Sequence, residues 1–271
     1  MNDTRFASFT QVDSESSDTK QTMVGYLDGL AALPGIQRVR QVARAALDIR
    51  PGQRLLDAGG GVGEEARELA RLAGPDGEVR AIDLSSDLVA LARQRDAGSG
   101  VRYAVGDITA LGFPDETFDG VRSERVLQHL TDPDVAVAEL VRVTVPGGRV
   151  CLIDTDWESF LVDGVPAELF SELRRLGPES VLKPSGRQLR GRLVRTGLTS
   201  ITAQPVAIPI SDRRTAEALH PVLNQALLDR VAPFPAHLTE PWFAALDDAL
   251  ARDEFLAVLT IWVVTGVKPL T

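Results

Sequence analysis

The residues best suited to chemistry are an acid and a cluster of glycines near position 60. Asp57 is followed by Gly59, Gly60, Gly61 and Gly63 in the segment DAGGGVG. Glycine loosens helices and strands alike, so such a cluster between two patterned elements indicates that a ligand comes very close to the main chain. The loop lies between a predicted strand and a predicted helix, where open α/β sheets bind nucleotide-type ligands.

Two other nucleotide-binding loops compete with this interpretation. No Lys-Ser or Lys-Thr pair follows the last glycine, so the loop is not a phosphate-binding P-loop. The run from Gly61 to Ala66 fits the dinucleotide pattern G-x-G-x-x-A, which leaves an NAD(P)-dependent oxidoreductase as an alternative. Glu64 and Glu65, however, would set anions at the helix N-terminus, where a pyrophosphate would bind. Asp57 would also repel a diphosphate, whereas it suits a ligand that carries an ammonium group.

The glycine loop is positioned by strands that alternate with helices along the chain. This alternation predicts a parallel sheet with helices on both faces. One or two helices are expected before the first strand. The predicted strands are 54–58, 79–84, 101–107, 118–124, 149–156, 198–210 and 255–267, and the predicted helices between them include 64–73, 85–97, 132–144, 165–177 and 185–197.

The segment LLDAGGGVGEEA (55–66) resembles the first motif, D-x-G-x-G-x-G, of the class I S-adenosylmethionine-dependent methyltransferases. The segments VRAIDLS (79–85) and VGDITALGFPDETFD (105–119) match in order. The run from 118 to 154 resembles the ubiquinone/menaquinone-biosynthesis type of small-molecule methyltransferase. The clear resemblance covers about 50–156. It implies a Rossmann-like α/β fold with a mostly parallel seven-stranded sheet, an antiparallel last strand and a helical cap.

The resemblance also implies which residues hold S-adenosylmethionine. Asp83, with Leu84 beside it, is expected to accept hydrogen bonds from both ribose hydroxyls, since one carboxylate can satisfy two vicinal donors. Asp107, with Ile108 beside it, is expected to contact the adenine amino group. Gly59, Gly61 and Gly63 let the backbone approach the ribose and the methionine portion.

Further residues are expected near the methionine end of the cofactor. The resemblance places Glu124, just after the fourth strand, beside the bound cofactor, and Asp57 suits the ammonium group. It also brings side chains from the N-terminal helices over the methionine portion. Tyr26 and Arg40 are our candidates for that role.

Methyl transfer from a sulfonium is an in-line displacement, so a catalytic side chain is harder to find than the cofactor site. His129 follows the fourth strand and is our candidate base. Trp157, Phe160, His220 and Trp242 are candidates for the substrate pocket. No His and carboxylate cluster has metal-ligand spacing, so no metal is expected. A cofactor-binding cyclase or scaffold protein without methyl transfer is a further alternative.

Composition narrows the class of partner. The net charge of −9 argues against nucleic acid, and no apolar run reaches the length of a membrane span. A single cysteine, Cys151, excludes an internal disulfide, and no signal peptide is evident, so a cytoplasmic monomer or homodimer is expected. Only three basic residues are lysine, which is typical of a GC-rich genome and suggests specialised-metabolite or quinone biosynthesis with a small, fairly apolar substrate.

The chain is expected to form one methyltransferase domain, 20–271, behind a flexible tail, 1–19. Within that domain, 20–50 is an N-terminal helical cap and 51–156 is the cofactor-binding core. The remainder, 157–271, forms the substrate-side half. Its helical stretch at about 213–252, between the last two strands, is a candidate lid over the pocket.

Overall fold

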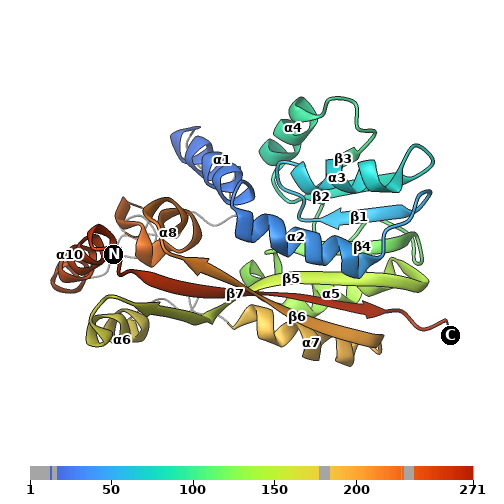
Figure 1. The fold of residues 1–271 in the computed structure, drawn as a ribbon. Coiled ribbons are helices and arrows are strands. Elements are labelled where there is room, and N and C mark those ends of the chain that lie inside the picture. The colour runs from blue at the N-terminus through green and yellow to red at the C-terminus, as the bar shows by residue number, and fades with distance from the viewer. Residues whose placement is uncertain (1–12, 14–16, 177–183, 227, 229–234, 271) are drawn as a thin grey trace.

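Figure 1 shows one twisted β-sheet at the centre of the protein, with helices on both faces. The computed structural model describes residues 13, 17–176, 184–226, 228 and 235–270. The seven strands lie in the order β3-β2-β1-β4-β5-β7-β6. Their bounds are β1 Arg54–Ala58, β2 Glu78–Asp83, β3 Arg102–Val105, β4 Phe118–Glu124, β5 Thr144–Asp163, β6 Thr199–Ile210 and β7 Leu256–Val267.

The direction of the strands confirms the predicted fold class. Strands β1 to β5 pair in parallel with one another. The last strand of the chain, β7, lies between β5 and β6 and is antiparallel to both. The sheet is therefore mostly parallel, with an antiparallel last strand, as the sequence predicts.

The helices cover both faces of the sheet, as crossover connections between parallel strands require. Helices α2, α3 and α4 pack on one face, and α5 and α7 pack on the other (Figure 1). The bounds in the described part of the chain are α1 Ser17–Ala31, α2 Pro34–Leu47, α3 Glu64–Ala73, α4 Ser86–Arg95, η2 Leu127–His129, α5 Pro133–Arg142, α6 Ala167–Leu176, α7 Ser185–Arg195, α8 Arg213–Leu219, η4 Pro221–Leu223 and α10 Ala236–Ala251.

Successive residues of β5 supply apolar side chains to both faces. Cys151 and Ile153 belong to the core beneath α2, whereas Val150 and Leu152 belong to the core beneath α5 and α7. A strand buried on both faces is typical of a parallel sheet covered by helices. Polar ligands can therefore approach this sheet only at the ends of its strands.

A side chain from before α1 fixes the start of α4. The carboxylate of Asp13 accepts a hydrogen bond from the backbone N–H of Ser86 at 2.8 Å and another from the Ser85 hydroxyl. The Ser85 hydrogen bond is the main cause that lowers the pKa of Asp13 to about 2. A helix N-terminus favours such an anion through its free N–H groups and its dipole. These bonds tie the N-terminal part of the chain to the loop that follows β2.

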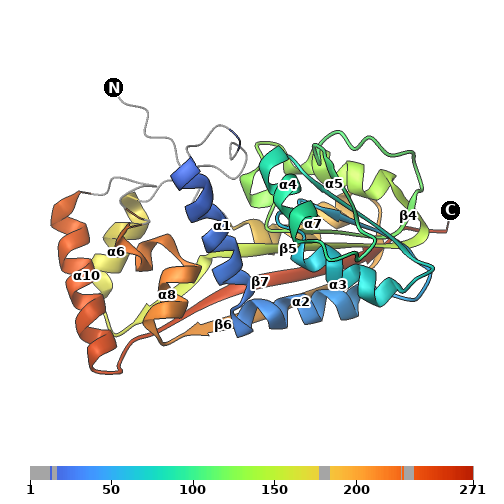
Figure 2. The same ribbon diagram turned by 90° about the horizontal axis from the view of Figure 1, so that it is seen from above.

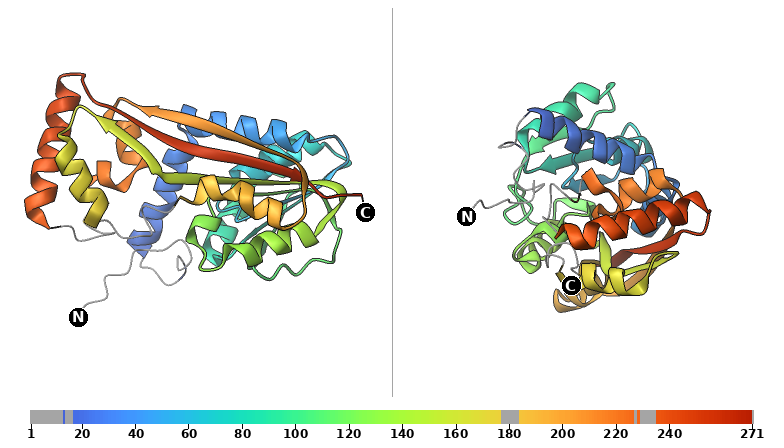
Figure 3. Two further views of the ribbon diagram at one scale, coloured as in Figure 1. Left: turned by 90° about the horizontal axis from the view of Figure 1, so that it is seen from below. Right: turned by 90° about the vertical axis from the view of Figure 1, so that its left-hand side faces the viewer.

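Strands β5, β6 and β7 continue well beyond the other four strands (Figure 2, Figure 3). We call this part, with α6, α8 and α10 around it, the extension. Helix α10 packs against α6, and both contribute to a core with the far ends of the three strands. The extension lies within residues 157–271, which the sequence predicts to be the substrate-side half, and that role stays a prediction.

The fifth strand is longer than the predicted 149–156. It continues to Asp163 because β7 pairs with it on both sides of a register shift between Asp156 and Leu161. Acidic residues at 154 and 156 interrupt the apolar pattern, so the sequence pattern does not indicate that the strand continues beyond 156. In the structure Asp156 is buried and its carboxylate accepts two hydrogen bonds from Arg187.

Most of the predicted flexible tail, 1–19, lies outside the described residues. Helix α1 begins at Ser17 and so takes up the last three residues of that range. Among the residues that the structure describes, no helix has both the length and the apolar character needed to span a bilayer.

Candidate functional site

A pocket opens at the carboxyl ends of β1, β2 and β4, and residues of α1 and α2 form its opposite wall. Ligands of open α/β sheets bind at this edge. The predicted site residues that line the pocket are Tyr26, Arg40, Asp57, Gly59, Gly61, Asp83, Leu84, Asp107, Ile108, Glu124 and His129.

The glycine loop turns between β1 and α3. Gly59 and Gly63 have φ angles of +81° and +76°, in the region that favours glycine. A Cβ on Gly59 would lie 2.2 Å from Cγ2 of Val126, and one on Gly63 would lie 2.6 Å from Cε1 of Tyr103. These two glycines therefore allow close packing, and Gly63 is not among the pocket-lining residues. Gly61 lines the pocket, and a Cβ there would meet only open space.

Asp83 ends β2 with its carboxylate turned toward the glycine loop. Its Oδ2 accepts a hydrogen bond from the N–H of Gly61 at 2.9 Å, and its Oδ1 accepts one from the N–H of Ser85 at 3.0 Å. Burial raises the pKa of Asp83, and the backbone hydrogen bonds oppose that shift. Each carboxylate oxygen keeps a second acceptor position, so this group can also take two hydroxyl donors from a ligand.

Asp107 lies just after β3 on the same edge of the sheet. Its Oδ1 accepts hydrogen bonds from the N–H and the hydroxyl of Thr109 at 2.8 and 2.7 Å. Its Oδ2 remains available to a donor in the pocket. Leu84, 49% exposed, and the buried Ile108 add apolar surface to the pocket wall nearby. An acceptor beside apolar surface suits a purine ring with an exocyclic amine.

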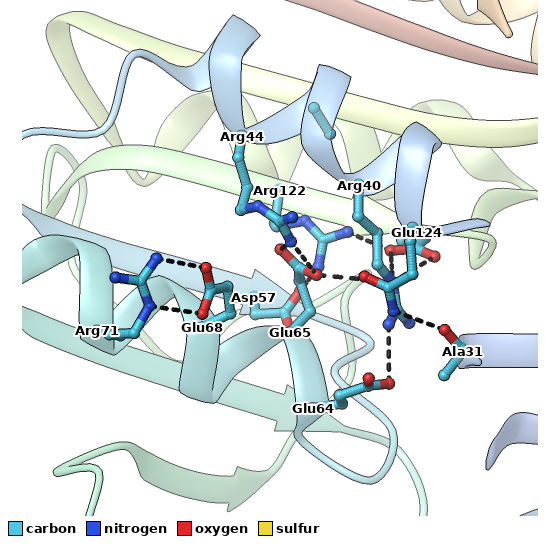
Figure 4. A network of polar contacts seen from close by, with 12 residues as sticks. Ala31, Arg40, Arg44, Asp57, Glu64, Glu65, Glu68, Arg71, Arg122 and Glu124 are labelled. Atoms are coloured by element: carbon cyan, nitrogen blue, oxygen red, sulfur yellow. Dashed lines mark hydrogen bonds and ion pairs between the residues drawn. The ribbon is translucent and has the colours of Figure 1, made fainter. Parts of the chain in front are cut away.

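A network of largely buried ion pairs connects β1, β4, α2 and the start of α3 (Figure 4). Arg122, in β4, is only 2% exposed and pairs with Asp57 at 3.0 Å and with Glu124. Arg40, in α2, pairs with the same Glu124 at 3.2 Å and with Glu64 at 2.8 Å. Because removing an ion from water costs several kcal/mol, buried charges persist only with such partners.

The acids of this network differ in their protonation behaviour. Burial raises the pKa of Asp57 to about 6, although Arg122 acts in the opposite direction. Burial has the same tendency at Glu124, but Arg40 and Arg122 outweigh it and hold the pKa of Glu124 below its usual range. The Oδ2 of Asp57 is buried and has no hydrogen-bond partner among the described residues. An orphaned carboxylate oxygen at a pocket indicates a place for a donor such as an ammonium group.

Arg122, Arg125 and Gln128 line the pocket and were not predicted from the sequence. For Arg122 a signal exists, since an arginine inside the central strand FDGVRSE must have buried partners. Arg125 and Gln128 lie in the turn that follows the same strand, where polar residues are common and do not by themselves indicate a binding role. Their roles depend on contacts with a residue of β5, which the spacing of the sequence does not reveal.

His129 lines the pocket in η2, after β4. The Nε1 of Trp157 donates a hydrogen bond to Oε1 of Gln128 at 2.9 Å, so the other end of that amide carries its N–H donors. This amide nitrogen lies 3.2 Å from Nε2 of His129. The network thus assigns the imidazole proton to Nδ1 and leaves Nε2 as the acceptor. Gln128 engages the basic nitrogen of His129, whose role as a base stays a prediction.

The four residues predicted for the substrate pocket come together, but in the core of the extension. His220 stacks on Phe160 with ring centroids 4.3 Å apart and meets Trp157 edge-on at 5.2 Å. Trp242 is fully buried nearby, where its Nε1 donates to the carbonyl of Val222. Burial lowers the pKa of His220 to about 3. None of these four residues lines the pocket, because the long strands need apolar rings to cover them.

The helical stretch predicted as a lid, 213–252, also lies at the extension. Its described elements, α8, η4 and α10, contribute no residue to the pocket wall. Helix α1 forms that wall instead, through Tyr26, Leu27 and Leu30. The apolar side chains of the stretch are used to cover β5, β6 and β7.

Known proteins share the glycine loop and the sheet around it. A family model described as a methyltransferase domain matches residues 56–152. An uncharacterized 37.1 kDa protein in transposon TN4556 of Streptomyces fradiae is 35% identical over 90% of this chain and 70% of that protein. The ubiquinone/menaquinone biosynthesis C-methyltransferase UbiE of Bordetella parapertussis is 37% identical over 49% of this chain and 55% of that protein. The chain belongs to the S-adenosylmethionine-dependent methyltransferases. This methyltransferase spans about half the length of the UbiE relatives that it matches.

Solved structures share the fold of this methyltransferase over most of its length. The [4+2]-cyclase SpnF has a TM-score of 0.60 at 20% identity and covers 98% of this chain and 99% of its own. Phosphoethanolamine N-methyltransferase 2 of Haemonchus contortus, solved with S-adenosyl-L-methionine, has a TM-score of 0.60 at 24% identity, over 97% of this chain and 60% of its own. These likenesses establish the fold alone. The family establishes S-adenosylmethionine, rather than a dinucleotide, as the cofactor.

Proposed function

We propose that the methyltransferase holds S-adenosylmethionine along the carboxyl ends of β1, β2 and β3 and methylates an oxygen or a carbon of a small, fairly apolar molecule. One observation carries this proposal. Asp57, Asp83 and Asp107 lie at or just after the ends of three neighbouring strands, in that order, and line one pocket with the glycine loop. Three acceptors in a row match a ligand whose hydrogen-bond donors are spread along its length.

Each carboxylate takes one part of the cofactor in this proposal. Asp83 accepts hydrogen bonds from the two ribose hydroxyls, which its free acceptor positions support. Asp107 accepts one from the adenine amine through Oδ2. Leu84 and Ile108 supply the apolar surface for the adenine ring.

The methionine end of the cofactor lies over β1 and β4. The buried Oδ2 of Asp57 has no hydrogen-bond partner among the described residues, so it is a suitable acceptor for the ammonium group. This observation supports placing the methionine end here. Glu124 adds negative charge beside it. Arg40, held between Glu64 and Glu124 at the pocket wall, is the candidate for the cofactor's carboxylate.

S-adenosylmethionine supplies an electrophilic methyl group, so the chain has to align the acceptor and keep water out. The apolar wall of α1, with Leu27 and Leu30, excludes water from the pocket. The amide of Gln128 orients His129, whose imidazole carries its proton at Nδ1. The Nε2 of His129 can accept a second proton once its hydrogen bond from Gln128 is broken. His129 is therefore the candidate to remove a proton from an acidic acceptor.

The acceptor is a small molecule of specialised-metabolite or quinone biosynthesis in this proposal. The name of the UbiE relatives supports the quinone branch. Apolar residues on the pocket wall, including Ile36 and Leu130, support an acceptor of low polarity.

Calorimetric titration tests the proposal. The purified protein is titrated with S-adenosylmethionine, S-adenosylhomocysteine and NADH in parallel. We expect S-adenosylmethionine and S-adenosylhomocysteine to bind with micromolar affinity and NADH not to bind. Binding of NADH alone would contradict the proposal. Mass spectrometry of phenol, quinol and enol acceptors incubated with S-adenosylmethionine then separates methyl transfer, seen as a gain of one methyl group, from a cyclase or scaffold role.

A further inference from the structure

Arg125 occupies an unusual position at the side of the pocket where β4 ends beside the middle of β5. Its backbone has a φ of +58°, in the left-handed region that residues with a side chain rarely adopt. Its N–H donates to the carbonyl of Ile153 in β5 at 2.7 Å. Its guanidinium lies over the ring of Trp157, 6.0 Å from the centroid. These contacts hold the side chain in the pocket wall on the β5 side.

Arg125 differs from the other two arginines that line the pocket. Arg40 and Arg122 each pair with carboxylates within 4 Å. No such pair involves Arg125 within the described part of the chain. Its Nε, like that of Arg122, is buried there without a hydrogen-bond partner. A cation held in this way favours an anion from elsewhere, because a buried donor without a hydrogen-bond partner is destabilising.

The acids nearest to Arg125 are already engaged with other groups. Burial raises the pKa of Asp154 and tends to raise that of Glu124, and the positive charge of Arg125 acts in the opposite direction at both carboxylates. The Oδ2 of Asp154 accepts hydrogen bonds from the Ser185 hydroxyl and the N–H of Gln128. Glu124 is bound by Arg40 and Arg122. These acids balance the charge of Arg125 through space but leave its N–H donors free.

We propose that Arg125 is a specificity-determining residue that binds a carboxylate group of the acceptor substrate. This inference rests on the proposed function, because it assumes that the cofactor fills the β1–β3 side of the pocket. Arg125 leans toward β5, through Ile153 and Trp157, and so away from the strands that hold Asp83 and Asp107. It therefore faces the space left for the acceptor.

The charge of the pocket selects a carboxylate over a phosphate. Six Asp and Glu side chains line it against three Arg side chains. A single guanidinium matches a monoanionic carboxylate with two parallel hydrogen bonds, whereas a phosphate dianion would meet repulsion from the surrounding acids. With the apolar wall of α1 opposite, the predicted substrate is an apolar molecule that carries one carboxylate.

The test uses the full-length protein saturated with S-adenosylhomocysteine. Benzoate, cinnamate and decanoate are titrated calorimetrically, each beside its primary amide. For at least one pair we expect the carboxylate to bind tenfold or more tightly than the amide. Arg125→Gln should abolish this preference, and Arg125→Lys should restore part of it. The matched control is Arg149→Gln, which removes a 38% exposed arginine of β5 outside the pocket and should keep the preference.

The outcomes separate this inference from the proposed function. Failure of S-adenosylhomocysteine to bind the wild-type protein overturns the proposed function and this inference with it. Normal cofactor binding without a carboxylate preference in any pair overturns this inference alone. Loss of S-adenosylhomocysteine affinity in Arg125→Gln also overturns it, because Arg125 would then hold the cofactor.

Discussion

The pocket end of the sheet and the extension are stabilised in different ways. At the pocket end, largely buried acids and arginines alternate in a network that joins α2, α3, β1 and β4. In the extension, aromatic and aliphatic side chains cover three long strands, and the buried His220 is neutral. The comparison teaches that the polar side chains of the pocket are concentrated at one edge of the sheet, while the side chains of the extension are used to stabilise its own long strands.

The largest effect is expected when the charge network is broken. Arg122→Met keeps most of the side-chain volume but removes the ion-pair partner of the buried Asp57 and leaves Glu124 paired with Arg40 alone. The free energy of unfolding should fall by about 3–5 kcal/mol, measured by urea denaturation. Arg149→Met, on β5 and 38% exposed, should cost less than about 1 kcal/mol. Equal losses in the two variants would show that the pocket end does not depend on buried charge pairs.

A pH-dependent effect is expected at Asp154, where the two regions meet. Burial raises its pKa from 3.8 to about 7, against the hydrogen bond from Ser185. The folded state therefore holds this proton more tightly than the unfolded state. The stability that this group contributes is present below about pH 4 and is lost as the pH rises toward 7. Asp154→Asn does not titrate, so it should gain roughly 1–3 kcal/mol over the wild type between pH 5 and 7.

Denaturation at a series of pH values measures this gain. The control is Asp163→Asn, which changes an exposed aspartate on the same strand and should follow the wild-type profile. Parallel profiles for wild type, Asp154→Asn and Asp163→Asn would contradict the assignment of the titration to the buried carboxyl.

The smallest effect is expected for a substitution in the core of the extension. Trp242→Phe keeps an aromatic ring but removes the hydrogen bond from Nε1 to the carbonyl of Val222. The free energy of unfolding should fall by about 1–2 kcal/mol, because a buried acceptor loses its partner and a small cavity forms. The affinity for S-adenosylhomocysteine should stay within about twofold. A large loss of affinity would mean that the extension shapes the cofactor site.

Local signals in the sequence account for the cofactor-binding half. Strands 54–58 and 118–124 and helix 64–73 were predicted with their observed bounds, because glycines, prolines and a change of period mark their ends. The carboxylates at the strand ends follow from the same pattern, since parallel strands finish at one edge of the sheet.

Long-range contacts explain what the sequence does not reveal. The pairing of Arg40 with Glu124 joins residues 84 positions apart, so only the folded chain brings them together. Strand β5 continues past its acidic residues because β7 pairs with it there. Trp157 and Phe160 have the composition of a pocket wall, but the same composition fits a core, and burial decides between the two.

The most direct test of the central claim is the affinity of Asp83→Ala for S-adenosylhomocysteine, measured by calorimetry beside Asp87→Ala. Asp87 is a half-exposed acid of α4 outside the pocket, so it matches the loss of charge. If Asp83 holds the ribose, its replacement weakens binding more than tenfold, about 1.4 kcal/mol, while Asp87→Ala binds as the wild type does. An unchanged affinity in Asp83→Ala would contradict the account of the pocket.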